Sequence, residues 1–91
     1  MKIKEGFMVR EVSGEILVVP VGAQSIDFKS VIRLNETGAF LWNKLQEDVT
    51  EDDLLEAILN EYDIDKDTAS GDIRRFVEKL IDSGIIECVN Q

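Results

Sequence analysis

The sequence predicts an α+β fold in which a three-stranded antiparallel sheet at the N-terminus precedes three helices. Two observations lead to this prediction. Segments up to position 34 are rich in β-branched residues and are separated by turn residues, whereas apolar residues after position 35 recur at helical spacing. The 91 residues contain no repeat, linker or low-complexity stretch, so we expect one domain that spans residues 1–91.

The first two predicted strands form a hairpin. Segments 7–12 and 15–21 are rich in valine and other apolar residues, and they flank Ser13 and Gly14. Glycine readily adopts the positive φ that a two-residue hairpin turn requires. Pro20 has no amide hydrogen to donate, which places it near the end of the second strand.

A third strand is predicted over residues 28–34, because its two parities differ in character. One parity is apolar and consists of Phe28, Ile32 and Leu34. The other is amphipathic and consists of Lys29, Val31 and Arg33. We therefore expect one face of this strand to lie on the core.

The first helix is predicted to begin after Asn35, which is a typical N-cap residue, and to extend to about Leu45. Its apolar stripe comprises Phe40, Leu41 and Leu45, with Trp42 at the border. Gly38 lies inside this helix, where glycine is a local cost to stability.

The second helix is predicted to begin at Thr50, which with Asp53 matches a capping box. Val49 and Leu54 are placed as a hydrophobic staple beside this cap. The apolar residues at helical spacing are Leu54, Leu55, Ile58, Leu59 and Tyr62.

The third helix is predicted to begin near Asp65 or Asp67 and to end at Gly84, which suits a left-handed C-cap. Its apolar residues are Ala69, Ile73, Phe76, Val77, Leu80 and Ile81. Segment 85–89 adds a short final strand or packs back on the core. Because only a few residues around 62–65 join the second and third helices, the outline is that of a winged helix-turn-helix.

The composition lacks residue types that most enzymes use for catalysis. Histidine is absent, which removes the commonest general base and the commonest zinc ligand. Cys88 is the only cysteine, so the chain forms neither an internal disulfide nor a cysteine metal site. The acidic run 47–53 lacks the turn glycine of a calcium loop and is interpreted as a solvated helix cap. We expect no enzyme activity, no metal and no cofactor.

The charge is strongly acidic and unevenly distributed. Ten Lys and Arg stand against 19 Asp and Glu, a net charge of -9, which disfavours binding to nucleic acid. Residues 46–91 alone hold 14 acidic and four basic side chains. No apolar run is long enough for a signal peptide or a membrane span, so we expect a cytoplasmic protein that does not bind membranes.

Basic residues cluster on two predicted elements, the third strand and the third helix. They are Lys29, Arg33, Arg74, Arg75 and Lys79. If the third strand lies at the sheet edge beside the third helix, the two form a groove with unpaired backbone groups on one wall and cationic side chains on the other. An extended peptide added as a further strand would pair with those groups. A solvated face of mixed charge is the other interpretation.

Several stretches together carry a family resemblance. Residues 34–40 read Leu-Asn-Glu-Thr-Gly-Ala-Phe, and residues 18–22 read Val-Val-Pro-Val-Gly. With the run from residue 72 to 86, these stretches closely resemble the PqqD-like family, and the resemblance covers residues 6–89. The stretch 34–40 is its specific part.

The resemblance implies a non-catalytic peptide recognition element of ribosomal peptide modification systems (a RiPP recognition element). Such a protein binds the leader segment of a precursor peptide as an extra strand against the third strand, in a cleft closed by the third helix. It presents the leader to a modifying enzyme, often a radical SAM maturase. The implied peptide-binding residues are Lys29, Ser30, Val31, Ile32, Arg33, Leu34, Asp72, Arg75, Phe76 and Lys79.

Two other functions stay open. A winged-helix transcription regulator would insert its third helix, with Arg74 and Arg75, into the major groove of DNA. The acidic charge of residues 46–91 opposes that function, since phosphate contacts require Lys or Arg. A maturase accessory or dimerisation subunit would hold no peptide. The chain is expected to be a monomer or, through an exposed strand edge, a strand-swapped homodimer.

Overall fold

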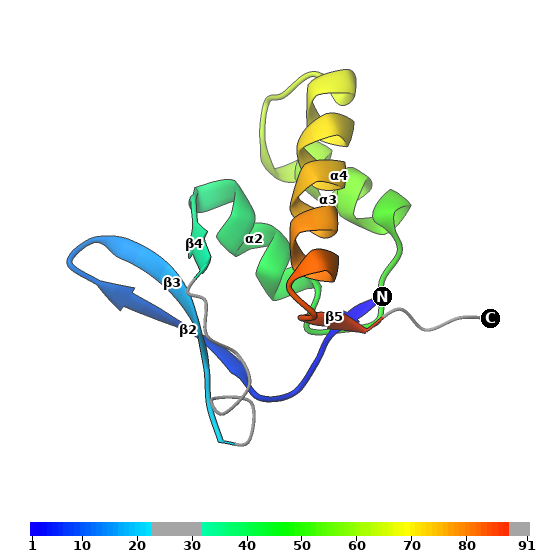
Figure 1. Ribbon diagram of the computed structural model, residues 1–91. Helices are drawn as coiled ribbons and strands as arrows, with labels where there is room; N and C mark the ends of the chain where they lie inside the picture. Colours follow the sequence, from blue (N-terminus) through cyan, green and yellow to red (C-terminus); the bar gives the residue numbers. More distant parts are fainter. Residues whose placement is uncertain (23–31, 88–91) are drawn as a thin grey trace.

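The computed structural model describes residues 1–22 and 32–87 (Figure 1). In this part of the chain an antiparallel sheet of order β2-β3-β4 is followed by three helices. The strands are β2 (Phe7–Val12), β3 (Glu15–Pro20) and β4 (Ile32–Leu34), and the helices are α2 (Glu36–Lys44), α3 (Glu51–Glu61) and α4 (Lys66–Asp82). The predicted α+β order is confirmed. The finer description as a winged helix-turn-helix stays a prediction.

The β2–β3 hairpin forms around Ser13 and Gly14, as predicted. Both residues have positive φ, 52° and 82°, as in the type I′ turn whose twist matches that of the flanking strands. Pro20 pairs with Phe7 and is the last residue of β3, where its missing amide costs the ladder least. The strand ends one residue before the predicted boundary.

A second sheet joins the two ends of the described chain, and the sequence did not predict this pairing. β1 (Lys2–Ile3) lies antiparallel to β5 (Ile86–Glu87), so that Ile3 faces Ile86. Both isoleucines are buried. Part of the predicted segment 85–89 therefore forms a strand, and its last two residues lie outside the described ranges.

The predicted caps determine where each helix begins. Asn35 caps α2, and its side-chain oxygen accepts a hydrogen bond of 2.7 Å from the amide of Gly38. Thr50 and Asp53 form the predicted capping box at the start of α3. Asp65 caps α4, which selects the first of the two predicted starts.

A single apolar cluster joins the sheet to the helices. Its most deeply buried side chains are Val18, Leu41, Leu45, Leu54, Ile58, Ile73, Val77, Leu80 and Ile85. Trp42, predicted at the border of its helix stripe, is only 3% exposed, whereas Phe40, predicted inside the stripe, is half-buried. The prediction was wrong because the buried face of α2 also includes Gly38, and glycine carries no apolar side chain that would mark the face.

The last turn of α4 also departs from the predicted stripe. Ile81 is 43% exposed, although its neighbour Leu80 is fully buried. Successive residues on a helix are separated by about 100°. Because the side chain of Leu80 points into the core, the side chain of Ile81 points away from the core and is exposed to solvent.

This difference gives a stability test on adjacent residues. Leu80→Ala should lower the free energy of unfolding by about 2–5 kcal/mol, because it leaves a cavity in the core. Ile81→Ala should change that free energy by no more than about 0.5 kcal/mol. Urea unfolding followed by the fluorescence of Trp42, the only tryptophan, measures both. Equal losses in the two variants would contradict the orientation of α4.

Candidate functional site

β4 is the outer strand of its sheet in the described part of the chain. It pairs with β3 on one side, with Val18 opposite Ile32 and Leu17 opposite Arg33. No described strand pairs with its other edge. The expectation of an edge strand therefore holds for Ile32–Leu34, while Lys29, Ser30 and Val31 lie outside the described residues.

The side chains of β4 alternate as the sequence predicted. Ile32 and Leu34 are buried, at 5% and 7% exposure, and Arg33 between them is exposed. The Arg33 guanidinium lies 3.2 Å from the carboxylate of Glu15 on β3. Arg33 is therefore at the rim of the sheet, and part of its charge is neutralised there.

Two adjoining pockets separate β4 from α4. The pocket beside β4 has a volume of about 140 Å³, and the pocket beside the first turn of α2 has a volume of about 230 Å³. They share Asn35, Gly38 and Phe76, so together they form one depression, which we name the β4–α4 cleft. Its lining residues are Ile32, Arg33, Leu34, Asn35, Thr37, Gly38, Leu41, Asp72, Arg75, Phe76 and Lys79.

The β4–α4 cleft brings together every predicted site residue that the structure describes. Three come from β4, namely Ile32, Arg33 and Leu34, and four come from α4, namely Asp72, Arg75, Phe76 and Lys79. The two groups are about forty positions apart in the sequence. Their role in peptide binding stays a prediction.

Sequence reasoning missed the contribution of α2 to this cleft. Asn35, Thr37, Gly38 and Leu41 line it, although none of them was among the predicted site residues. A Cβ at Gly38 would lie 3.1 Å from the capping oxygen of Asn35 and 3.4 Å from the ring of Phe76. Glycine therefore lets α2 and Phe76 approach closely. A signal was present for three of these four residues, because Asn35, Thr37 and Gly38 lie in the family-specific stretch 34–40.

Ion pairs reduce the positive charge that the sequence suggested for the cleft. Arg75 pairs with Asp72 one helical turn earlier on α4. Lys79 has no ion-pair partner among residues 1–22 and 32–87. The cleft therefore keeps a modest excess of positive charge in a chain whose net charge is -9.

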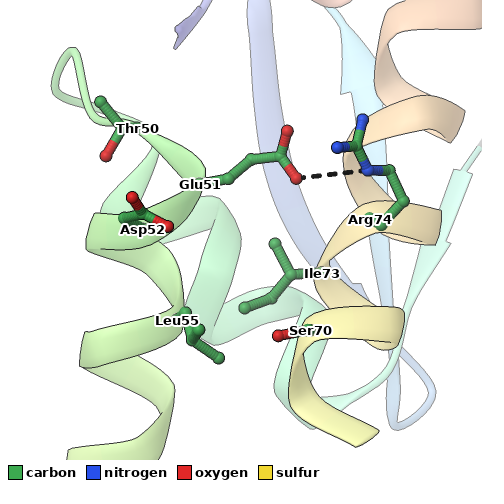
Figure 2. Close-up of a pocket in the computed structure, with 7 residues that line it drawn as sticks. All are labelled: Thr50, Glu51, Asp52, Leu55, Ser70, Ile73 and Arg74. Carbon is green, nitrogen blue, oxygen red and sulfur yellow. Dashed lines mark ion pairs between the residues drawn. The ribbon is translucent and has the colours of Figure 1, made fainter. Parts of the chain in front are cut away.

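Arg74 faces away from the cleft, into a separate pocket of about 430 Å³ between α3 and α4. Figure 2 shows its guanidinium directed at Glu51, and the two groups are 3.5 Å apart. Leu55 of α3 and Ile73 of α4 also line this pocket. Arg74 is therefore engaged with α3 and does not extend the basic surface predicted on α4.

Tyr62 lies outside the β4–α4 cleft and has a shifted pKa. The pKa of the Tyr62 phenol is raised, first by partial burial and then by the nearby charges of Glu36 and Glu61. Tyr62 therefore stays neutral near neutral pH. Among the described residues, no group of three or more His, Cys, Asp or Glu is placed to hold a metal ion. In the same residues, no helix is long and apolar enough to cross a membrane.

The geometry defines a small domain whose open strand edge faces a helix across a cleft. The family model described as "Coenzyme PQQ synthesis protein D (PqqD)" matches residues 7–86, and the chain belongs to this family. A search among curated proteins found no significant match.

Two solved structures share this fold. One is described as "TbiB1 in Complex with the TbiA(beta) Leader Peptide", with 22% identity, a TM-score of 0.74, and coverage of 100% of both chains. The other is described as "Lasso peptide synthetase B1 complexed with the leader peptide", with 18% identity and a TM-score of 0.68. That match covers 92% of this chain and 93% of the other.

The two helical glycines test the close packing in the cleft. At Gly71, a Cβ would meet only the flexible side chain of Arg75, at 3.5 Å. Gly71→Ala should therefore raise the free energy of unfolding by about 0.5–1 kcal/mol, the usual gain in helix propensity. Gly38→Ala should lower it, because the added methyl group crowds Asn35 and Phe76. Chemical unfolding measures both, and equal stabilisation would show that the contact at Gly38 is not a constraint.

Proposed function

We propose that this chain is a non-catalytic adaptor that binds the leader segment of a ribosomally made precursor peptide and presents it to a modifying enzyme. The observation that carries the proposal is the open edge of β4, which faces α4 across the β4–α4 cleft. Membership of the PqqD family supports it, and so do two similar structures whose descriptions name a leader peptide.

In this proposal the leader pairs through its backbone with β4 and with the preceding residues Lys29, Ser30 and Val31. Backbone pairing supplies affinity that depends little on sequence, and side-chain pockets supply selectivity. Alternate leader side chains then enter the β4–α4 cleft, while the others point to the opposite face of the sheet.

The lining of the cleft indicates the chemistry of the leader. Phe76 is half-buried and common to both pockets, so it is placed to contact an apolar anchor residue. Lys79 and Arg75 stand on the same helix and favour acidic residues beside that anchor. Buried apolar contacts carry most of the energy at such interfaces, and rim charges mainly set the encounter rate.

The proposal also covers the modifying enzyme, the cellular compartment and the form of the domain. A radical SAM maturase is the first candidate for the modifying enzyme, and the cytoplasm is the expected compartment. We propose residues 1–91 as a single recognition domain of winged helix-turn-helix form. The regulator function is not favoured, because Arg74 and Arg75 are engaged by Glu51 and Asp72.

Side-chain variants on α4 test the cleft. With the leader of a precursor encoded beside this gene, Phe76→Ala should weaken binding at least about tenfold, mainly through faster dissociation. Lys79→Glu should slow association with an acidic leader and reduce its salt dependence. Stopped-flow binding at two ionic strengths measures both effects, with thermal melts to confirm folding.

Arg74→Glu is the matched control, because it reverses a charge on the same helix outside the cleft. It should leave leader binding unchanged. If Arg74→Glu and Lys79→Glu have equal effects, overall charge controls binding and the cleft does not.

Proline substitutions in β4 test strand addition. Adjacent amides in a strand point to opposite edges, so one of Ile32 and Arg33 donates toward β3 and the other toward the open edge. We expect one of Ile32→Pro and Arg33→Pro to stay folded and to lose at least about tenfold in leader affinity, because a backbone donor is removed. Circular dichroism and titration of a labelled leader measure folding and affinity. Two folded variants with full affinity would rule out pairing at this edge.

A further inference from the structure

Most of the large exposed apolar side chains in the described residues lie on or directly after the β2–β3 hairpin. Five large apolar side chains are more than a third exposed, and four of them lie on or directly after the hairpin. These four are Met8, Val9, Val12 and Val21. No residue of β2 is buried, and in Figure 1 the hairpin extends away from the helices. The hairpin therefore exposes apolar side chains that the rest of the described chain leaves uncovered.

The strand register places these side chains on two faces. Val18 is fully buried and lies opposite Val9 and Ile32, so these three residues mark the face directed at the core. Directly opposed residues share a face, and alternate residues point to the other one. The other face, which we name the outer sheet face, consists of Met8, Arg10, Val12, Glu15, Leu17, Val19 and Arg33.

The outer sheet face has the composition of a protein interface. Four of its seven residues are apolar, and two of its three charged residues are arginines. Apolar patches of this kind on small proteins mark interaction sites, and interface centres are poor in charge but rich in arginine. Arg10 has no ion-pair partner in the described part of the chain, whereas Arg33 pairs with Glu15. A complementary surface would be apolar and bordered by carboxylates.

The outer sheet face is also continuous with the proposed leader site. Arg33 belongs both to this face and to the open strand β4. A leader added along β4 would extend the sheet by one strand, and half of its side chains would point outward beside Leu17 and Arg33. A partner seated on this face would therefore touch the adaptor and the leader at once. A second copy of this chain fits less well, because both copies carry a charge of -9.

We propose that the outer sheet face is the docking surface for the modifying enzyme, which contacts it with an apolar patch bordered by carboxylates. This inference rests on the proposed adaptor function. The enzyme recognises a composite surface that is complete only when the leader occupies β4, so leader-loaded adaptor binds more tightly than free adaptor.

The test uses the full chain, the leader, and the peptide-modifying enzyme encoded in the same gene cluster. Met8→Gln and Val12→Thr together remove apolar character while keeping side-chain size and strand propensity. This double variant should weaken binding of the leader-loaded chain to the enzyme at least about tenfold, and leader affinity should stay within about twofold. Arg10→Glu should slow association with the enzyme and reduce its salt dependence.

Ile81→Gln is the matched control, because Ile81 is as exposed as Met8 but lies on α4. It should change neither binding reaction. Unchanged enzyme affinity in the folded double variant and in Arg10→Glu would overturn the inference while leader binding persists. Failure of the unmodified chain to bind leader would instead overturn the adaptor function. If the unmodified chain dimerises without enzyme and the double variant is monomeric by analytical ultracentrifugation, a second copy covers this face and the inference is wrong.

Discussion

The close approach of Gly38 to the ring of Phe76 brings the α2 and α4 sides of the candidate site together. β4 ends at Leu34, Asn35 caps the next helix at once, and Gly38 follows in the first turn. The open strand edge and the start of α2 are therefore one continuous piece of backbone. Phe76 approaches this piece from α4, and a Cβ at position 38 would lie 3.4 Å from its ring and 3.1 Å from the capping oxygen of Asn35.

Several acidic residues near the helices have local structural partners. The carboxylates of Asp53 and Asp65 accept hydrogen bonds from the backbone amides of Thr50 and Thr68 at helix starts, where negative charge also interacts favourably with the helix dipole. Glu51 and Asp72 pair with arginines of α4. Such exposed pairs add little to stability. Their main effect is on charge distribution, because they leave Lys79 as the unpaired cation of the cleft in the described residues.

Local signals in the sequence were sufficient for the hairpin and the helix starts, whereas the family resemblance indicated the β4 and α4 residues of the cleft but not those of α2. Capping residues act on amides within three positions, so their effect is readable without knowledge of the fold. The pairing of β1 with β5 was not readable, because strands of two residues have no periodicity and their partners lie at opposite ends of the described chain. The burial of Trp42 was also not readable, because the buried face of α2 includes Gly38, which has no apolar side chain to mark that face.

The charge of the site was the least predictable feature. The sequence indicated basic residues on β4 and α4 but not their partners. Glu15 reaches Arg33 only because the register brings the start of β3 near the end of β4. The i to i+3 spacing of Asp72 and Arg75 was readable, and it indicates that Arg75 is partly neutralised before any ligand arrives. Family resemblance indicated two of the elements that line the cleft and left this charge balance undetermined.

The outer edge of β2 has a consequence for behaviour at high protein concentration. An edge strand of six residues is a template for association with other strands, and β2 pairs with no described strand on that side. Arg10 and Glu11 lie near its middle, so a second chain pairing antiparallel about position 10 would bring two arginines together. This local repulsion, added to the net charge of -9, opposes association through this edge. Both effects are screened by salt, so colloidal stability decreases as ionic strength rises.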